Sequence, residues 1–221
     1  MLKLSSKSKK IKIGKGSTIG KNAVVGLQPR DKTIDSLEIG YNATIRAGTI
    51  IYLGSKIGDN LQTGHNAVIR EKNGLGNSVR VGTGSELAPE NKIGNNVTIH
   101  SGCFLEQCSI GNNVFIGPNV VFTDDSHPHC PKWAECIGGA TVEDNVSIGA
   151  NTTVLPGVKI GKNSLIGAGS VVSKDIPANS VAFGNPARVV KKISELKCLK
   201  GFYKKPYVWL DEKVPGPRVS D

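Results

Sequence analysis

Residues 122–136, FTDDSHPHCPKWAEC, bring together the side chains of this 221-residue sequence that are best suited to chemistry. The stretch contains two of the four histidines and two of the five cysteines. These residue types are compatible with three kinds of chemistry: metal ligation, disulfide formation, and proton transfer by an imidazole.

The spacing within this stretch favours neither a metal nor a disulfide. His127, His129, Cys130 and Cys136 are ligand types for zinc, but H-x-H-C-x5-C is not a recognised structural zinc pattern. An odd number of cysteines and a start without an apolar leader fit a reducing compartment. We therefore expect a cytoplasmic protein without a metal and without a disulfide here, which leaves a histidine base as the third hypothesis.

The net charge of the chain bears on which kinds of molecule it could bind. Lysine and arginine number 28 against 18 aspartates and glutamates, a net charge of +10 with the excess at both ends. Nucleic acid would fit such a balance, but neither interleaved aromatic residues nor a binding motif supports it. A solvated surface and a small anionic ligand remain as interpretations. No apolar run approaches the length of a membrane span, so no membrane association is expected.

The rest of the sequence is a repeat that must position this stretch. Large apolar anchors recur every six residues from Ile39 to Leu105, with Thr63 as the polar exception, and shorter series begin at Ile13, Ile110 and Val142. Such a period fits neither a helix nor a plain strand. It fits a coil of flat faces in which each short strand points one large residue inward and a small residue lies two places before it. Glycine commonly follows the anchor, where it would tolerate unusual backbone angles.

Three breaks interrupt this period. Val25 and Ile39 are fourteen residues apart, two more than two hexads, and the anchors at 105 and 110 are five apart. Phe122 and Val142 are twenty apart, and the gap contains the histidine and cysteine stretch. Because a solenoid tolerates an excursion at a corner, residues 123–141 are expected to form a corner loop insert.

The hexads IGKGST, IGNNVF, IGANTT and IGAGSV resemble the repeat of the hexapeptide-repeat acyltransferase family. The resemblance implies an all-β fold, a left-handed parallel β-helix of about eight coils, and a homotrimer. Residues 1–185 would be the catalytic domain. In residues 186–221, ARVVKKISELKC would form a short C-terminal α-helix that caps the open coil end, followed by an extended tail.

Three segments resemble the family's coenzyme A contacts: IGAN, IGAGSVVSKD and GNPARVVKK. The resemblance implies acetyl-CoA as the donor, with small residues along its narrow pantetheine arm and cations near its phosphates. The matching positions are Gly149, Ala150, Gly167, Ala168, Ser173, Lys174, Arg188 and Lys191.

Two branches of the family compete for the acceptor side. The Ser-His-Pro that follows IGPNVVFTDD resembles sugar and xenobiotic O-acetyltransferases, in which the matching histidine deprotonates the acceptor hydroxyl, so His127 is the candidate base. TGHNAVIREKN, together with FTDD, resembles nucleotide-sugar N-acetyltransferases, whose amine acceptor needs less help from a base. We expect transfer to the amino group of a nucleotide-linked sugar, with O-acetylation as the alternative. The expected acceptor contacts are His65, Glu106, Asp124 and Asp125.

An enzyme of another class, a β-helix metal enzyme of the γ-carbonic-anhydrase type, would need a histidine triad at coil spacing. His65, His100 and His127 do not share one register, so this alternative is not favoured.

Overall fold

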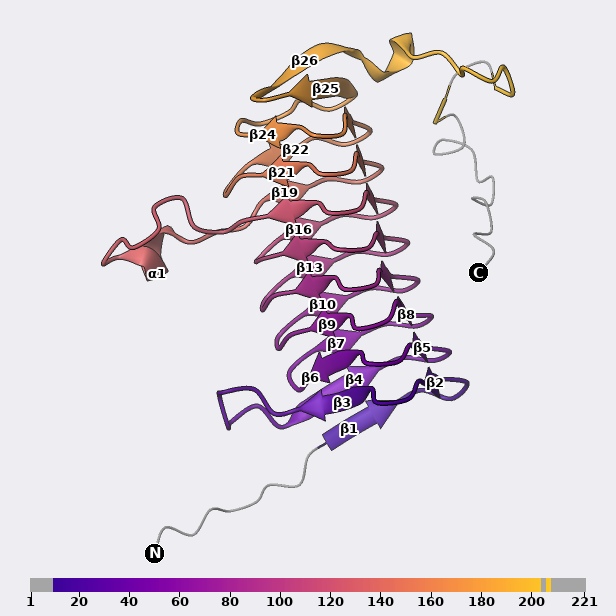
Figure 1. Ribbon diagram of the computed structural model, residues 1–221, viewed down its shortest axis with the longest axis vertical. Coiled ribbons are helices and arrows are strands. Elements are labelled where there is room, and N and C mark those ends of the chain that lie inside the picture. The colour runs from indigo at the N-terminus through magenta and orange to yellow at the C-terminus, as the bar shows by residue number, and fades with distance from the viewer. Residues whose placement is uncertain (1–9, 204–205, 208–221) are drawn as a thin grey trace, which may run out of the picture.

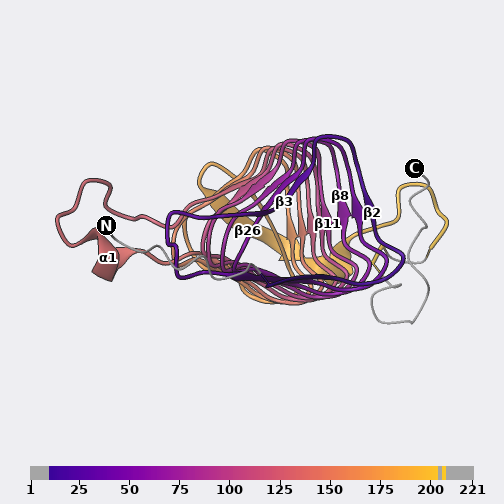
Figure 2. The same ribbon diagram turned by 90° about the horizontal axis from the view of Figure 1, so that it is seen from below.

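A computed structural model describes residues 10–203 and 206–207, which form a prism of stacked coils (Figure 1). Viewed along its axis, the prism has three flat walls, and each coil contributes one short strand to each wall (Figure 2). Two walls have eight strands, and the third has ten because two further strands extend it at the C-terminal end. The architecture is the expected left-handed parallel β-helix of eight coils.

The three walls are called sheets A, B and C, in the order in which each coil runs through them. Sheet A consists of β1 (Lys10–Ile13), β4 (Ser36–Ile39), β7 (Lys56–Ile57), β10 (Gly74–Leu75), β13 (Lys92–Ile93), β16 (Ser109–Ile110), β19 (Thr141–Val142) and β22 (Lys159–Ile160). Sheet B consists of β2 (Thr18–Ile19), β5 (Thr44–Ile45), β8 (Gln62–Thr63), β11 (Arg80–Val81), β14 (Thr98–Ile99), β17 (Phe115–Ile116), β20 (Ser147–Ile148), β23 (Leu165–Ile166), β25 (Ser180–Gly184) and β26 (Ala187–Lys192). Sheet C consists of β3 (Val24–Leu27), β6 (Ile50–Tyr52), β9 (Val68–Ile69), β12 (Glu86–Leu87), β15 (Phe104–Leu105), β18 (Val121–Phe122), β21 (Thr153–Val154) and β24 (Val171–Val172).

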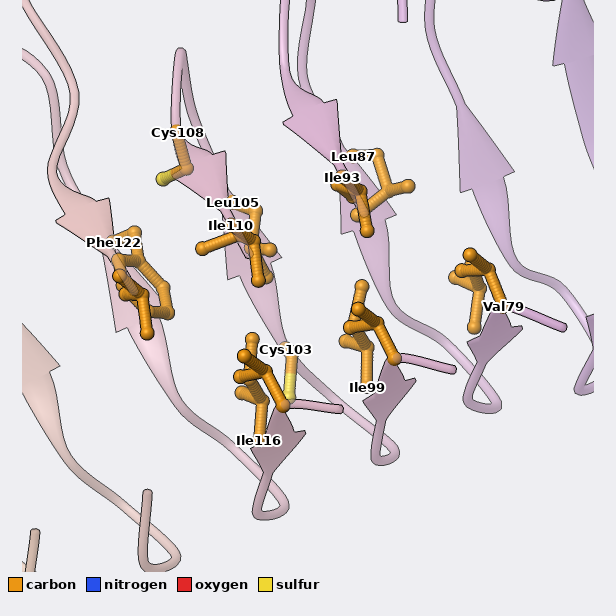
Figure 3. Close-up of a cluster of buried hydrophobic side chains, with 14 of the residues drawn as sticks. Val79, Leu87, Ile93, Ile99, Cys103, Leu105, Cys108, Ile110, Ile116 and Phe122 are labelled. Atoms are coloured by element: carbon orange, nitrogen blue, oxygen red, sulfur yellow. The ribbon is translucent and has the colours of Figure 1, made fainter. Parts of the chain in front are cut away.

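From the second coil onward, the anchors of the six-residue period fill the interior of the prism, whereas Ile13 and Ile19 of the first coil are exposed. Leu87, Ile99, Leu105 and Ile116 are fully buried and lie in columns on successive coils (Figure 3). Cys103 and Cys108 take small-residue positions in the same core and are buried free thiols.

The polar anchor Thr63 is buried without an unsatisfied hydroxyl. Its Oγ1 lies 2.9 Å from Oγ1 of Thr49 and accepts a hydrogen bond from the backbone N–H of Arg46 at 2.9 Å. A buried hydroxyl with such partners is tolerated in a core, so the exception in the apolar series does not interrupt the coil.

The glycine that follows most anchors has a different function from the one that the sequence predicted. A Cβ added at Gly94 would lie 2.7 Å from the carbonyl oxygen of Gly111 in the next coil. The unusual backbone angle falls two residues later, at Asn96, whose φ is 55°. Asparagine adopts this left-handed conformation more readily than most residues. The glycine is therefore required by the close approach of the coils, and the asparagine makes the turn.

All three breaks in the period lie at the corner between sheet C and sheet A, which we call the C–A corner. Equivalent residues of adjacent coils are normally 18 apart, but they are 26 apart across the first excursion, 17 apart at the deletion and 32 apart across the insert. Both excursions project from the same side of the prism (Figure 1). No strand lies between β3 and β4, so residues 28–35 form one excursion at this corner.

The predicted C-terminal α-helix was also wrong. Ala187–Lys192 forms β26, which pairs antiparallel with β25, and Ile193–Glu195 forms a single 3₁₀ turn, η1. The backbone of β25 would otherwise present an unpaired edge, and β26 satisfies it. The one α-helix of the described residues, α1 (Trp133–Cys136), lies instead in the insert. Most of the predicted tail, namely residues 204–205 and 208–221, lies outside the described residues.

Close stacking predicts that two similar glycine substitutions will have different effects. Gly94→Ala will lower the free energy of unfolding by about 1–3 kcal/mol, because the new methyl group meets backbone that cannot move aside. Gly74→Ala is the matched control, since its Cβ would enter open space. It should stay within about 1 kcal/mol of the wild type. Urea unfolding followed by circular dichroism measures both, and equal losses would contradict the stacking explanation.

Candidate active site

The insert leaves the prism after β18 and returns at β19, and its base is attached firmly to the coils. The N–H of Gly138 donates to the carbonyl of Asp124 at 2.8 Å, and the N–H of Gly157 donates to the carbonyl of Gly138 at 3.1 Å. A Cβ added at Gly139 would lie 2.3 Å from the carbonyl oxygen of Gln107. The shortened corner therefore packs directly against the returning chain, while the tip with α1 extends away from the prism (Figure 1).

His127 lies in the projecting part of the insert and is exposed. Its backbone N–H donates to Oδ1 of Asp125 at 2.7 Å, and its carbonyl accepts from the N–H of Cys130 at 3.0 Å. These bonds hold the backbone of His127 in a tight turn and leave the imidazole open to a bound molecule.

The corner next to the insert contains a cluster of carboxyl groups. The side chains of Glu106 and Asp124 are hydrogen-bonded to each other. Burial, followed by the charge of Asp124 and this hydrogen bond, raises the pKa of Glu106 to about 7, and the charges of Glu86 and Asp125 act in the same direction. A protonated Glu106 can donate to Asp124, so one proton stabilises two adjacent carboxyl groups.

The structure thus brings together three of the four predicted acceptor contacts: Glu106, Asp124 and Asp125. His65 is not part of this cluster. It is exposed at the corner between sheets B and C, where its N–H donates to Oγ1 of Thr83 at 3.2 Å.

A buried polar ladder supports the C–A corner, and the sequence analysis missed it. Oγ of Ser55 accepts from the N–H of Asn73, Oδ1 of Asn73 from the N–H of Asn91, and Oδ1 of Asn91 from the N–H of Cys108, at 2.8–3.1 Å. All four residues are buried. The signal was present in the sequence, because polar residues recur at the small-residue position of successive coils.

An ion pair on the same corner was also missed. Arg70 Nε lies 3.0 Å from Oε2 of Glu71, and its Nη2 lies 3.1 Å from Oε1, so the pair is bidentate. The guanidinium carbon lies 5.3 Å from the centre of the Tyr52 ring. Burial raises the pKa of Glu71, but the bonds and charge of Arg70 outweigh it and hold this pKa below its usual value.

The predicted donor contacts are spread over three places in one chain. Gly149, Ala150, Gly167 and Ala168 form a column at the corner between sheets B and C, where a Cβ added at Gly149 would lie 2.4 Å from the N atom of Ala168. Coil stacking alone therefore already requires Gly149.

The other predicted donor contacts are exposed. Ser173 and Lys174 follow β24 at the C–A corner, and Arg188 and Lys191 lie on β26. Nη1 of Arg188 donates to the carbonyl of Ala187 at 3.0 Å. No interaction with a neighbouring carboxylate holds this guanidinium within the described residues, so it is available to a ligand.

Within residues 10–203 and 206–207, no group of three or more histidine, cysteine, aspartate or glutamate side chains is placed to hold a metal ion. Cys130 and Cys136 are free thiols. No helix of the described part of the chain is long and apolar enough to cross a membrane.

Comparisons with known proteins agree with the repeat. The family model described as "Bacterial transferase hexapeptide (six repeats)" matches residues 139–174, and the model "Hexapeptide repeat of succinyl-transferase" matches residues 10–53. Residues 10–53 and 139–174 therefore carry the repeat of hexapeptide-repeat transferases. The two matches lie at opposite ends of the prism, on either side of the insert.

Individual known proteins are similar to this chain over part of their length. A galactoside O-acetyltransferase of Lactococcus lactis is 50% identical over 90 residues, which is 39% of this chain and 44% of that protein. A 2,3,4,5-tetrahydropyridine-2,6-dicarboxylate N-acetyltransferase of Staphylococcus aureus is 39% identical over 90 residues, 41% of this chain and 35% of that protein. The crystal structure of a maltose O-acetyltransferase from Clostridium difficile matches with 41% identity and a TM-score of 0.41, covering 47% of this chain and 59% of that chain. The chain thus spans less than half the length of these two curated relatives.

The carboxyl cluster of this hexapeptide-repeat protein predicts a pH-dependent stability. The folded-state pKa of Glu106, about 7, lies above its ordinary value of 4.5. The folded protein therefore holds this proton more tightly than the unfolded chain. The resulting stabilisation is complete below about pH 4.5 and is lost as the pH rises through about 7. Glu106→Gln, which does not titrate, should remove this loss.

Urea unfolding near pH 5 and about pH 8 tests the prediction. The wild type should lose more stability between these two conditions than Glu106→Gln does. Glu135→Gln, which removes a carboxyl group from the exposed tip of the same insert, should behave like the wild type. Parallel curves for the wild type and Glu106→Gln would contradict a shared proton at this corner.

Proposed function

We propose that this chain is an acetyl-CoA-dependent acetyltransferase that acts on a sugar hydroxyl. The observation that carries the proposal is the 50% identity over 90 residues with a galactoside O-acetyltransferase. The geometry is compatible with it, since an exposed histidine and a cluster of carboxyl groups lie at one corner of a rigid prism.

This proposal replaces the expectation of an amino-sugar acceptor. The resemblance of residues 63–73 to nucleotide-sugar N-acetyltransferases rested on short motifs, and an N-acetyltransferase is less similar to this chain than the galactoside enzyme is. A hydroxyl acceptor also gives His127 a chemical task. An alcohol must lose its proton as it attacks, whereas an amine that binds neutral already has a free lone pair.

The proposed reaction has one proton and one acetyl group to transfer. The acceptor oxygen attacks the thioester carbonyl carbon of acetyl-CoA while the imidazole of His127 removes the hydroxyl proton. The carbon–sulfur bond then breaks, and the thiolate of coenzyme A takes the proton from the imidazolium. The products are an acetylated sugar and coenzyme A, and the imidazole is neutral again.

The carboxyl groups beside the insert suit the acceptor. Glu106, Asp124 and Asp125 offer several oxygen atoms that accept hydrogen bonds from sugar hydroxyls. Asp125 has a second task, since it fixes the backbone of His127. We place the acceptor at this corner and assign catalysis to residues 1–185, with the insert at 123–141.

The donor site needs more than one chain. In a single prism the predicted coenzyme A contacts lie at two corners and on a terminal strand, and flat walls do not enclose a long cofactor. Three parallel prisms in a homotrimer would create clefts between a corner of one subunit and a wall of the next, and a projecting insert could reach such a cleft. We therefore propose a trimer with donor sites between subunits.

Removal of the base is the most direct test of the reaction. His127→Ala should lower kcat for acetylation of a galactoside by about 10²–10⁴-fold, because the hydroxyl loses its proton acceptor. The wild-type rate should rise with pH as the imidazole loses its proton, and the mutant should lack this rise. Release of free thiol from acetyl-CoA measures both.

His129→Ala is the matched control, since it removes the other exposed imidazole of the insert and should retain activity. A panel of galactosides and nucleotide-linked amino sugars separates the two acceptor classes. Faster turnover of an amino sugar, with full kcat in His127→Ala, would refute O-acetylation with a histidine base.

The donor assignment predicts a selective effect on acetyl-CoA. Arg188→Ala should raise the KM for acetyl-CoA about tenfold or more and leave the KM for the sugar nearly unchanged, because a charged hydrogen bond to phosphate contributes about 1.5–3 kcal/mol. Arg30→Ala, an exposed arginine of the first excursion, is the control and should change neither KM. Equal acetyl-CoA KM values for both variants would show that Arg188 is an ordinary surface residue.

A further inference from the structure

We propose that a hollow on sheet B binds the anionic group, carboxylate or phosphate, of a saccharide. The hollow has a volume of about 390 Å³ and lies over β5, β8, β11 and β14, near the corner between sheets B and C. Its lining includes Arg46, Arg80 and His100, together with Gln62 and Thr83. Within one chain it is separate from the insert, which leaves the prism at the C–A corner between later coils.

Arg80 is the principal cation of this hollow. It occupies the outward position of β11, between Gln62 of β8 and Thr98 of β14. Its Nη2 donates to Oε1 of Gln62 at 2.9 Å, which is a neutral partner. A guanidinium has five N–H donors in a planar fork that matches carboxylate and phosphate oxygens. The bond to Gln62 therefore orients Arg80 and leaves its charge and most of its donors for a ligand.

His100 adds a second hydrogen-bond donor, and its tautomer is set by a backbone hydrogen bond. The N–H of Ser101 donates to Nδ1 of His100 at 3.0 Å, so Nδ1 is an acceptor and the ring hydrogen of the neutral imidazole resides on Nε2. Within the described residues, Nε2 has no hydrogen-bond partner. The ring also packs edge-on against Phe115, with centroids 6.3 Å apart and an interplanar angle of 64°. A held ring with a free N–H is suited to an anionic oxygen.

The remaining lining residues indicate a saccharide rather than a bare ion. Gln62 has an amide nitrogen with two hydrogens, and the hydroxyl of Thr83 retains its own hydrogen, since the bond with the N–H of His65 uses only its oxygen. Neutral amide and hydroxyl groups beside an arginine match the mixed hydroxyl and anionic surface of an acidic or phosphorylated sugar. Among the described residues that line the hollow, none is acidic.

Binding of an anion in this hollow does not require acetyl transfer at the insert. The carboxyl groups of the insert corner would repel an anion, whereas the basic lining of sheet B attracts one. An acidic saccharide would therefore contact sheet B through its anionic group, whether or not another part of it reaches the insert.

Calorimetric titration of the full chain in the absence of acetyl-CoA tests the proposal. The probes are glucuronate for a carboxylate, galactose 1-phosphate for a phosphate, and galactose as the neutral control. At least one anionic probe should bind at least about tenfold more tightly than galactose, and the tighter of the two identifies the preferred anion. Arg80→Gln should raise the Kd of that probe by about tenfold or more.

Lys92→Gln, which removes the same charge from the exposed face of sheet A, is the matched control and should change the affinity by less than about twofold. Circular dichroism establishes that each variant is folded. His100→Gln, together with titration of the wild type at increasing salt, provides a second measurement should Arg80→Gln fail to fold, and both should weaken binding. Three results would overturn the proposal. They are equal affinities of Arg80→Gln and Lys92→Gln for the anionic probe, an affinity of the wild type for galactose equal to that for the anionic probes, and no binding of either anionic probe at about 10 mM.

Discussion

Each coil of this protein must stack in register on the coil before it, and the rest of the structure depends on this requirement. The strands are only two or three residues long in most coils, so their backbone groups find partners only in adjacent coils. A residue added or removed within a wall would misalign every later strand and turn anchors outward. Extra residues are tolerated only at corners, which explains why the two excursions and the deletion leave the walls intact.

Side chains at the corners reinforce the same register. On the outer surface, Oδ1 of Asp59, Asn77 and Asn95 each accept from the backbone N–H of the preceding coil at 2.8 Å. Inside the C–A corner, Oδ1 of Asn73 and Oδ1 of Asn91 each accept from the backbone N–H of the following coil, without access to water. Loss of such a buried partner leaves an unsatisfied amide, which costs about 1–3 kcal/mol. Corner asparagines are therefore structural elements of this fold.

The candidate active site depends on this corner. The coil that lacks one residue places Cys108 at the end of the buried ladder, where its Sγ contacts the carbonyl of Glu106 at 3.2 Å. The insert leaves the prism at the same corner one coil later, and Asp124 at its base interacts with Glu106. The deletion and the insert together bring the carboxyl group of Glu106 next to the base of the loop that bears His127. The hollow on sheet B is basic, with Arg80 and His100, whereas the insert corner is acidic. This difference arises at outward positions, whose side chains are not constrained by the stacking of the coils.

The sequence by itself determined the inward-facing residues, the eight coils and the position of the insert, because the six-residue period directly reports which side chain each strand buries. It did not determine which glycines and asparagines make the turns, since the spacing between coils imposes the stricter limit at Gly94. It also misassigned Ala187–Lys192, because a local apolar pattern cannot reveal that β25 offers an unpaired edge. The contact between Glu106 and Asp124 and the hollow around Arg80 were decided only by the tertiary structure. Residues about 18 apart become neighbours when a coil closes, and the charge and hydrogen bonds of each side chain then depend on the coils above and below it.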